Sequence, residues 1–139
     1  MFAALDASTS ALVAQRTRLD AIASNIANMS TTHNEAGEAV PYQPRFVVFQ
    51  TDDSAGPGVP PGVKVSSVET ADLAPNYKYQ PGHPDAIKTG DRAGYVAFPN
   101  VDLTTEMVDA IEATRAYEAN DGVIQITKNL VAQSLKIIA

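Results

Sequence analysis

The chain has 139 residues with a formal net charge of −6 at pH 7, and it contains no cysteine. This length allows one folding unit, and the lack of cysteine excludes disulfides, thiolate catalysis and cysteine-ligated zinc. Ten Lys and Arg residues stand against 16 Asp and Glu residues without any basic run, so nucleic-acid binding is not expected. We predict neither a cleaved signal nor insertion into a membrane.

Helix-breaking residues divide the sequence into three segments. All nine prolines lie between Pro41 and Pro99, and seven of the eight glycines lie between Gly37 and Gly94. Because proline and glycine disfavour helix interiors, both ends can be helical and the middle cannot. We therefore predict an α+β fold: an N-terminal helix (residues 1–30), a β-rich middle with long loops (31–100) and a C-terminal helix (101–139). The two helices are expected to pack as a coiled-coil-like pair or bundle, forming one helical assembly domain.

The first segment repeats large apolar residues every seven positions, at Leu5, Leu12, Leu19 and Ile26. Such a repeat predicts a helix that packs along its length against other helices, although a core helix of a globular domain is the alternative. Asn25 and Asn28 lie beside this line near its end. They either fix one docking register through buried amides or simply end the helix, and both roles are compatible.

The middle segment contains four runs rich in β-branched and aromatic residues, at 45–50, 63–70, 77–79 and 95–98. These runs predict strands of a small antiparallel β domain. The sequence DDSAGPGVPPG separates the first two runs and is too long and too rich in proline for a tight turn. It is expected to form an exposed loop between paired strands.

The last segment predicts one continuous helix. Asn100 or Asp102 can cap it, acidic residues crowd its first turns, and lysines come late, as the helix dipole favours. Asp121-Gly122 predicts a kink or a close helix approach. Its apolar seam is traced through a longer set: Leu103, Met107, Thr114, Tyr117, Ile124, Val131, Leu135 and Ile138, with Ile111 alongside.

A helix pair from one chain cannot cover every apolar position in these two segments. Several fall outside any single seam, namely Val13, Val108, Ile126, Leu130 and Ile137. Helices of neighbouring subunits would cover them, so the pattern favours assembly.

Residues that carry chemistry are sparse. His33 and His83 lie fifty residues apart in turn-rich sequence, without the spacing that fixes a metal, and are expected to be surface turn residues. The glycines of GPGVPPG lack the spacing and the following helix of a phosphate-binding loop. We predict no catalytic residue, no metal site and no cofactor.

The segment Ser24-Asn25-Ile26-Ala27-Asn28 resembles the motif that ends the N-terminal helix of bacterial flagellar axial proteins. YQPRFVVFQ (42–50), GVKVSSVE (62–69), PGHPDA (81–86), GYVAFPNVDLTTEMVDAI (94–111) and RAYEAN (115–120) follow in order. Together they are similar to the short, C-type rod proteins of this family. The sequence departs from the family pattern at IKTGDRA (87–93) and at Asp121-Gly122.

The resemblance implies a non-enzymatic structural subunit of the proximal rod in the flagellar basal body, spanning the periplasm. It implies export by the flagellar type III apparatus, polymerisation through the terminal helices and transmission of torque from rotor to hook. The implied partners are the B-, F- and G-type rod proteins, the hook-basal-body protein that links the rod to the membrane rotor ring, the export apparatus and other copies of the chain.

The residues expected at the assembly interface come from both helices. They are Leu5, Leu12, Leu19, Ile22, Ser24, Asn25, Ile26, Asn28, Met107, Ile111, Arg115, Tyr117, Asn120, Ile124, Val131 and Leu135. The alternative, from another functional class, is a small enzyme or binding module whose β-rich middle holds a ligand. That module would keep its activity on residues 31–100, whereas assembly needs both terminal helices.

Overall fold

The computed structural model describes residues 2–138 apart from 35, 54–55 and 57–60. In chain order the elements are α1 (Phe2–Ala27), β1 (Arg45–Asp52), β2 (Gly62–Thr70), β3 (Asn76–Tyr79), β4 (Tyr95–Phe98) and α2 (Leu103–Ile138). The predicted α+β class, with long terminal helices around an antiparallel β middle, is confirmed. Most of the predicted loop between the first two strands falls outside the described residues.

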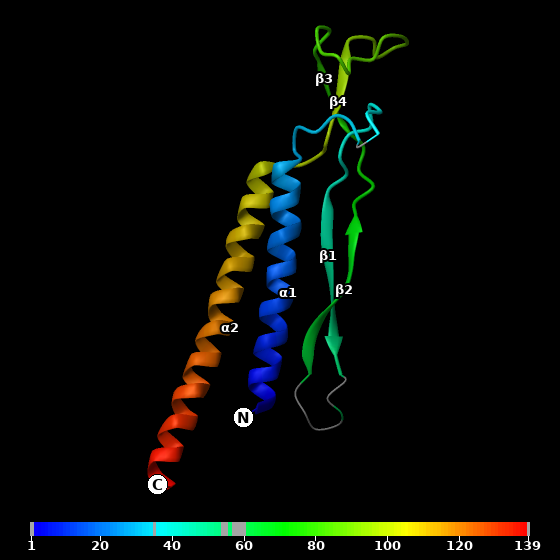
Figure 1. Cartoon of the computed structure of the whole chain (residues 1–139). Coiled ribbons are helices and arrows are strands. Elements are labelled where there is room, and N and C mark those ends of the chain that lie inside the picture. Colours follow the sequence, from blue (N-terminus) through cyan, green and yellow to red (C-terminus); the bar gives the residue numbers. More distant parts are fainter. Residues whose placement is uncertain (1, 35, 54–55, 57–60, 139) are drawn as a thin grey trace.

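The molecule is long and thin, with α2, α1 and the β1–β2 hairpin lying side by side (Figure 1). Helix α1 lies between α2 on one side and the β1–β2 hairpin on the other, and α1 and α2 run antiparallel. The β3–β4 hairpin stands beyond the C-terminal end of α1. At the opposite end, α2 continues past the start of α1, so its last turns lie without a partner helix.

The ends of the helices follow from their polar residues. Asp102 caps α2, because its carboxylate accepts hydrogen bonds from the Thr104 amide at 3.0 Å and the Thr105 hydroxyl at 2.9 Å. At the end of α1, the Asn28 side chain donates to the Ser24 carbonyl at 2.9 Å and accepts from the Thr31 hydroxyl at 3.2 Å. Asn28 therefore ends the helix, which is one of the two roles predicted for Asn25 and Asn28 from the sequence.

The β1–β2 hairpin lies along α1 and is fastened by Ser10 near the end at which Asp52 pairs with Gly62. Strands β1 and β2 pair antiparallel, with a bulge at Val48/Phe49. The Ser10 hydroxyl accepts the Val63 amide at 3.1 Å. A Cβ at Gly62 would lie 2.8 Å from that hydroxyl, so the approach of hairpin to helix requires glycine there.

The second hairpin is a separate two-stranded sheet, β3 paired with β4, so the antiparallel β middle consists of two ribbons. Val96 of β4 is fully buried. Gly94, with φ of 84°, brings its backbone against the Tyr79 ring, where a Cβ would lie 2.7 Å away. The Thr32 hydroxyl donates to Asp85 at 2.6 Å and ties this hairpin to the segment that leaves α1.

Small residues occupy most of the buried helix positions. Ala14 and Ala21 of α1 and Ala113 of α2 are 2%, 8% and 0% exposed. Ala21 lines hollows together with residues of β1 and β2, so the hairpin lies over this alanine face. Since α1 is the element that α2 contacts, Ala113 is buried against α1.

The first half of the predicted seam of α2 does not face α1 within the chain. Met107 and Ile111 are 54% and 53% exposed, whereas Ala113 is buried; Ile124 and Val131 are half-buried as expected. The trace followed large side chains, but the close helix approach uses alanine. Helix α2 runs through Gly122 without interruption, and a Cβ there would meet nothing within 4 Å, so the predicted close approach is absent within the described chain.

Candidate assembly interface

Asn25 joins three elements with one amide. Its Nδ2 donates to the Arg45 carbonyl at 2.8 Å and to Glu106 Oε1 at 3.0 Å. Its Oδ1 accepts from the Arg45 amide at 2.8 Å and from the Tyr42 hydroxyl at 3.0 Å. The residue is 3% exposed, and all four hydrogen-bonding positions of the amide are used.

This arrangement, which we call the Asn25 clasp (Asn25, Tyr42, Arg45 and Glu106), fixes where α1 meets β1 and α2. Ser24 adds to it, because its hydroxyl lies 3.1 Å from the Tyr42 hydroxyl. The prediction that buried amides set one register describes Asn25 well. The register it sets lies within the chain, and the amide has no capacity left for a neighbouring subunit.

Glu106 supplies the carboxyl group of the clasp, and the pKa of this group is shifted. Burial raises the pKa of Glu106, the hydrogen bond from Asn25 lowers that pKa, and the nearby Asp109 charge raises it again, with a net upward shift. The protein therefore disfavours the charge on this group, because a carboxylate loses hydration between α1, β1 and α2.

A second polar link between the helices lies one turn further along α2. Arg18 Nη2 approaches Asp109 Oδ1 at 3.3 Å and Glu112 Oε2 at 3.5 Å. These pairs are partly exposed, so each contributes at most about 1 kcal/mol. Their main effect is to align α1 with α2 at this level.

The residues predicted for assembly divide into three groups. Ile22 and Asn25 are buried within the chain. Leu5, Leu12, Leu19, Ser24, Ile26, Asn28, Asn120, Ile124 and Val131 are half-buried. Those open to solvent are Met107, Ile111, Arg115, Tyr117 and Leu135.

Large apolar side chains outside these groups are also uncovered. Val13, Ile126 and Leu130 are 62%, 62% and 51% exposed, and Val108 is 59% exposed. The described chain has an accessible surface of 9373 Å², whereas a compact monomer of its 14.7 kDa exposes about 6,900 Å². The fold thus leaves apolar surface along both helices that other protein surfaces can cover.

The structure brings both histidines to one carboxylate. His33 Nδ1 and His83 Nδ1 lie 3.7 and 3.8 Å from Asp85 Oδ2, which Thr32 also contacts. Among the described residues, no group of three or more His, Cys, Asp or Glu side chains could hold a metal ion. Neither described helix combines the length and apolarity that crossing a bilayer requires.

Sequence reasoning missed the partners of Asn25. Tyr42 lies in the segment leading into β1 and Arg45 is the first residue of β1, and Glu106 was taken only as part of the acidic start of α2. No local pattern places them together, because the contacts join positions 17, 20 and 81 residues apart.

Comparisons with known proteins agree with this architecture. Residues 5–33 match the model of the flagella basal body rod protein family, and residues 92–137 match that of the flagellar basal body rod FlgEFG protein C-terminal region. The first match covers most of α1 and its exit, and the second covers β4 and α2.

Curated relatives match over nearly the whole chain. The flagellar basal-body rod protein FlgC of Borreliella burgdorferi is 39% identical, with 99% of this chain and 97% of the relative aligned. That of Bacillus subtilis is 40% identical over 98% and 97%. That of Salmonella typhimurium is 39% identical over 95% and 93%.

These names describe structural rod proteins and not enzymes, which agrees with a surface of uncovered helix faces. The chain therefore belongs to the FlgC family of flagellar basal-body rod proteins, structural proteins of the basal-body rod.

Proposed function

We propose that this chain polymerises through α1 and α2 in the proximal rod and passes torque from the rotor to the hook. In this proposal the subunit leaves the cell through the flagellar type III apparatus. Its neighbours are other copies, the B-, F- and G-type rod proteins and the hook-basal-body protein that joins the rod to the membrane rotor ring.

The observation that carries the proposal is the uncovered apolar surface along both helices. Among the residues whose burial the structure describes, Val96 of the β3–β4 hairpin is the only large side chain below 2% exposure, while α2 leaves Val108, Ile126 and Leu130 more than half exposed. Side chains of this kind gain about 1.5–3 kcal/mol each when fully buried. Neighbouring helices would supply that burial, and torque would pass through the resulting contacts.

Gene deletion with complementation tests the proposal. Cells lacking the gene receive the full-length chain or a version without residues 1–30, and swimming and purified basal bodies are examined by electron microscopy. We expect rods only with the full-length chain. Intact rods and swimming in the deletion strain would overturn the proposal, and rods built by the shortened chain would overturn the role of α1.

A matched pair of point variants sharpens this test. Ile124→Asp places a charge on the face of α2 that packs on α1, and Gln125→Asp places the same charge on the neighbouring exposed position. We expect Ile124→Asp to abolish rods, because an unpaired charge in a helix interface is costly. Gln125→Asp should leave motility near wild type; equal effects of the two would contradict the helix-interface argument.

A further inference from the structure

A groove runs along α1 between β1 and α2. Ala21 and Ile22 of α1 line its floor, Phe46 and Phe49 of β1 form one wall, and Glu106 stands on the α2 side. The hollow measures about 320 Å³. Phe46 and Phe49 are 46% and 36% exposed, so this wall presents aromatic surface that the chain itself does not cover.

The α2 wall of the groove is acidic. Glu106 and Asp109 line it, and Glu112 follows one turn from Asp109. Arg18 is the cation that meets this wall, at 3.3 Å from Asp109 and 3.5 Å from Glu112. Arg18 thus pairs with Asp109 and Glu112, whereas Glu106 accepts a hydrogen bond from Asn25, and Arg45 also lines the hollow on the β1 side. The Glu112 side chain is still 67% exposed.

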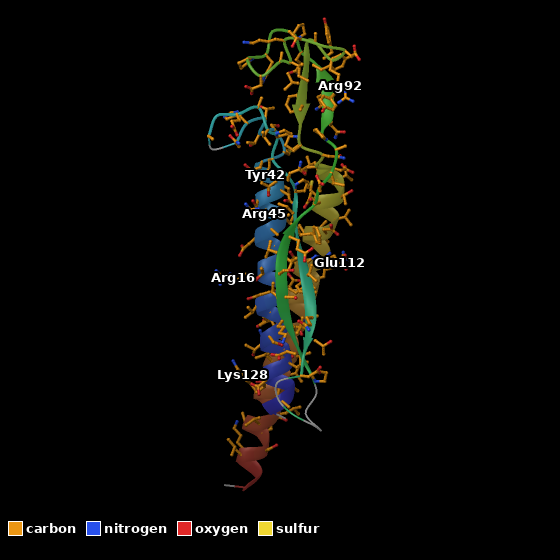
Figure 2. All side chains as sticks on the ribbon, turned by 90° about the vertical axis from the view of Figure 1, so that its right-hand side faces the viewer. Arg16, Tyr42, Arg45, Arg92, Glu112 and Lys128 are labelled. Atoms are coloured by element: carbon orange, nitrogen blue, oxygen red, sulfur yellow. The ribbon has the colours of Figure 1, made fainter. Side chains whose placement is uncertain are left out.

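The opposite side of α1 carries the complementary features. Val13 and Arg16, one turn apart, lie on the solvent face, and Val13 is 62% exposed. Arg16 forms no ion pair with any described residue. Asp20 continues the same face, but it lines a separate hollow that Arg45 also lines. In Figure 2, Arg16 extends on one side of the molecule and Glu112 on the other.

These two sides also lie at matching heights. Arg18 contacts Glu112, so Arg16, two residues earlier on α1, is close to the level of Glu112 along the rod. Phe49 lies between the two points that fasten β1–β2 to α1, at Asn25 and Ser10, and Val13 lies between the same points. A second copy placed alongside with little axial shift would bring each feature opposite its complement.

We propose that this groove receives the Val13–Arg16 face of α1 from a second copy, with Arg16 against the acidic α2 wall and Val13 against Phe49. One helical turn with side chains, about 10 Å across and 5.4 Å long, exceeds the volume of the hollow. Individual side chains of a neighbouring helix fit it, and a whole inserted helix does not. The inference rests on the proposed function and adds the surfaces by which copies meet.

The contact is directional. Each copy offers a groove on one side and the Val13–Arg16 face on the other, so two different surfaces meet and both remain available for the next copy. Such an interface orders subunits around or along a rod in one sense and does not close as a symmetric dimer.

Disulfide mapping tests the proposal directly, because the chain contains no cysteine. Cells lacking the gene express the full chain with Val13→Cys and Phe49→Cys together, and isolated basal bodies are oxidised and analysed on non-reducing gels. We expect disulfide-linked dimers and longer ladders of this chain. A second pair, Val13→Cys with Phe46→Cys, covers the case in which the first fails to assemble.

The controls separate the alternatives. Each single variant should give no dimer, because identical surfaces do not meet. Val13→Cys with Val68→Cys should also give no dimer. Val68 lies outside the proposed groove, because it lines a different hollow, on the side of α1 that carries Asp20. Dimers from Val13→Cys alone, or no dimers from either groove pair in rods that assemble, would overturn the proposal while leaving the rod function standing. Normal rods in the deletion strain would instead overturn the function itself.

A charge swap provides the second measurement. Arg16→Glu should impair swimming, and adding Glu112→Arg in the same chain should restore it, because each copy then presents the reversed pair to the next. Lys88→Glu, the same charge change at an exposed loop position, should leave swimming unchanged. Glu112→Arg also breaks the Arg18–Glu112 pair within the chain, so the double variant is compared with Glu112→Arg alone, which shares that loss. If the double variant swims no better than either single variant in chains that still form rods, the proposed pairing is wrong.

Discussion

At the scale of single residues, Asn25 decides how the elements meet. A helix interior usually gains little from asparagine, whose amide competes with backbone hydrogen bonding. Here the amide lies at 3% exposure and satisfies both backbone groups of Arg45. The Asn25 amide thus bonds the first residue of β1 in the way that a neighbouring strand would. These bonds hold the β1–β2 hairpin at one position along α1.

Replacement of Asn25 should destabilise the isolated protein. Asn25→Ala removes the side-chain partner of the Arg45 amide and one of the two partners of the Tyr42 hydroxyl, which keeps Ser24, at a cost of about 2–4 kcal/mol. Denaturant unfolding measures this loss, and Asn28→Ala at the helix exit is the control with a smaller expected cost. Equal stability of Asn25→Ala and wild type would contradict the clasp.

Glu106 predicts a pH dependence with a definite sign. Its pKa is raised in the folded state, so folding favours the protonated carboxyl, and this contribution is present at low pH. This stabilising contribution is lost as the pH rises from 4.5, the ordinary pKa of the Glu carboxyl, through the raised pKa of Glu106 in the folded protein. Glu106→Gln keeps an oxygen for the Asn25 hydrogen bond and removes the charge.

The Gln variant should therefore gain stability over wild type at about pH 7 and lose that advantage at about pH 4. Unfolding midpoints at the two pH values measure the difference. Glu118→Gln, on the exposed side of the same helix, controls for the loss of one negative charge. A Glu106→Gln advantage that is the same at both pH values would contradict the stated cause.

At the scale of elements, the helices use small residues where they pack and large ones where they are open. Ala113 is fully buried against α1, whereas Ala119 in the same helix is exposed. Ala113→Leu should cost about 1–3 kcal/mol through overpacking. The identical change at Ala119 should be near neutral, and denaturant unfolding of both variants checks the contrast. Equal effects would mean that the seam tolerates larger residues.

The sequence predicted which segments are helices or strands and most of their bounds. It did not predict which side of each element is buried within the chain. Proline and glycine placement located both helices, and β-branched runs located all four described strands. The buried contact of Ala113 with α1 was not predicted, because alanine carries little hydrophobic signal although it permits the closest approach. The division of the β middle into two ribbons was also missed, since β1–β2 packs on α1 through contacts distant in sequence.

The sequence predicted that the helices form the candidate interface, but it predicted only some of the residues that remain open for neighbouring subunits. Regular apolar spacing indicated helices that need neighbours, and exposed Met107, Ile111 and Leu135 agree with that interpretation. Asn25, in contrast, was expected between subunits and is fully engaged within its own chain. Its partners Tyr42, Arg45 and Glu106 have no sequence signature as a group.

At the scale of the whole molecule, burial is concentrated toward one end of the rod. Ala21, Asn25, Thr32, Val96 and Ala113 lie toward the β3–β4 hairpin, whereas Ala14 lies midway along α1 and Ser8 lies in its first half. The opposite half of the molecule holds the end of α2, where Ile126, Leu130 and Leu135 are more than half exposed. Segments with few buried contacts open most easily, so that half is expected to fray in a free subunit and to become ordered among neighbours.

The most direct test of this account is the helix content of the free subunit. Far-ultraviolet circular dichroism of dilute protein, shown to be monomeric by sedimentation, is compared with the 26 residues of α1 and 36 residues of α2. We predict clearly less helix than these two elements would give together. A dilute monomer with both helices fully formed would contradict the claim that the terminal helices complete their folding in the rod.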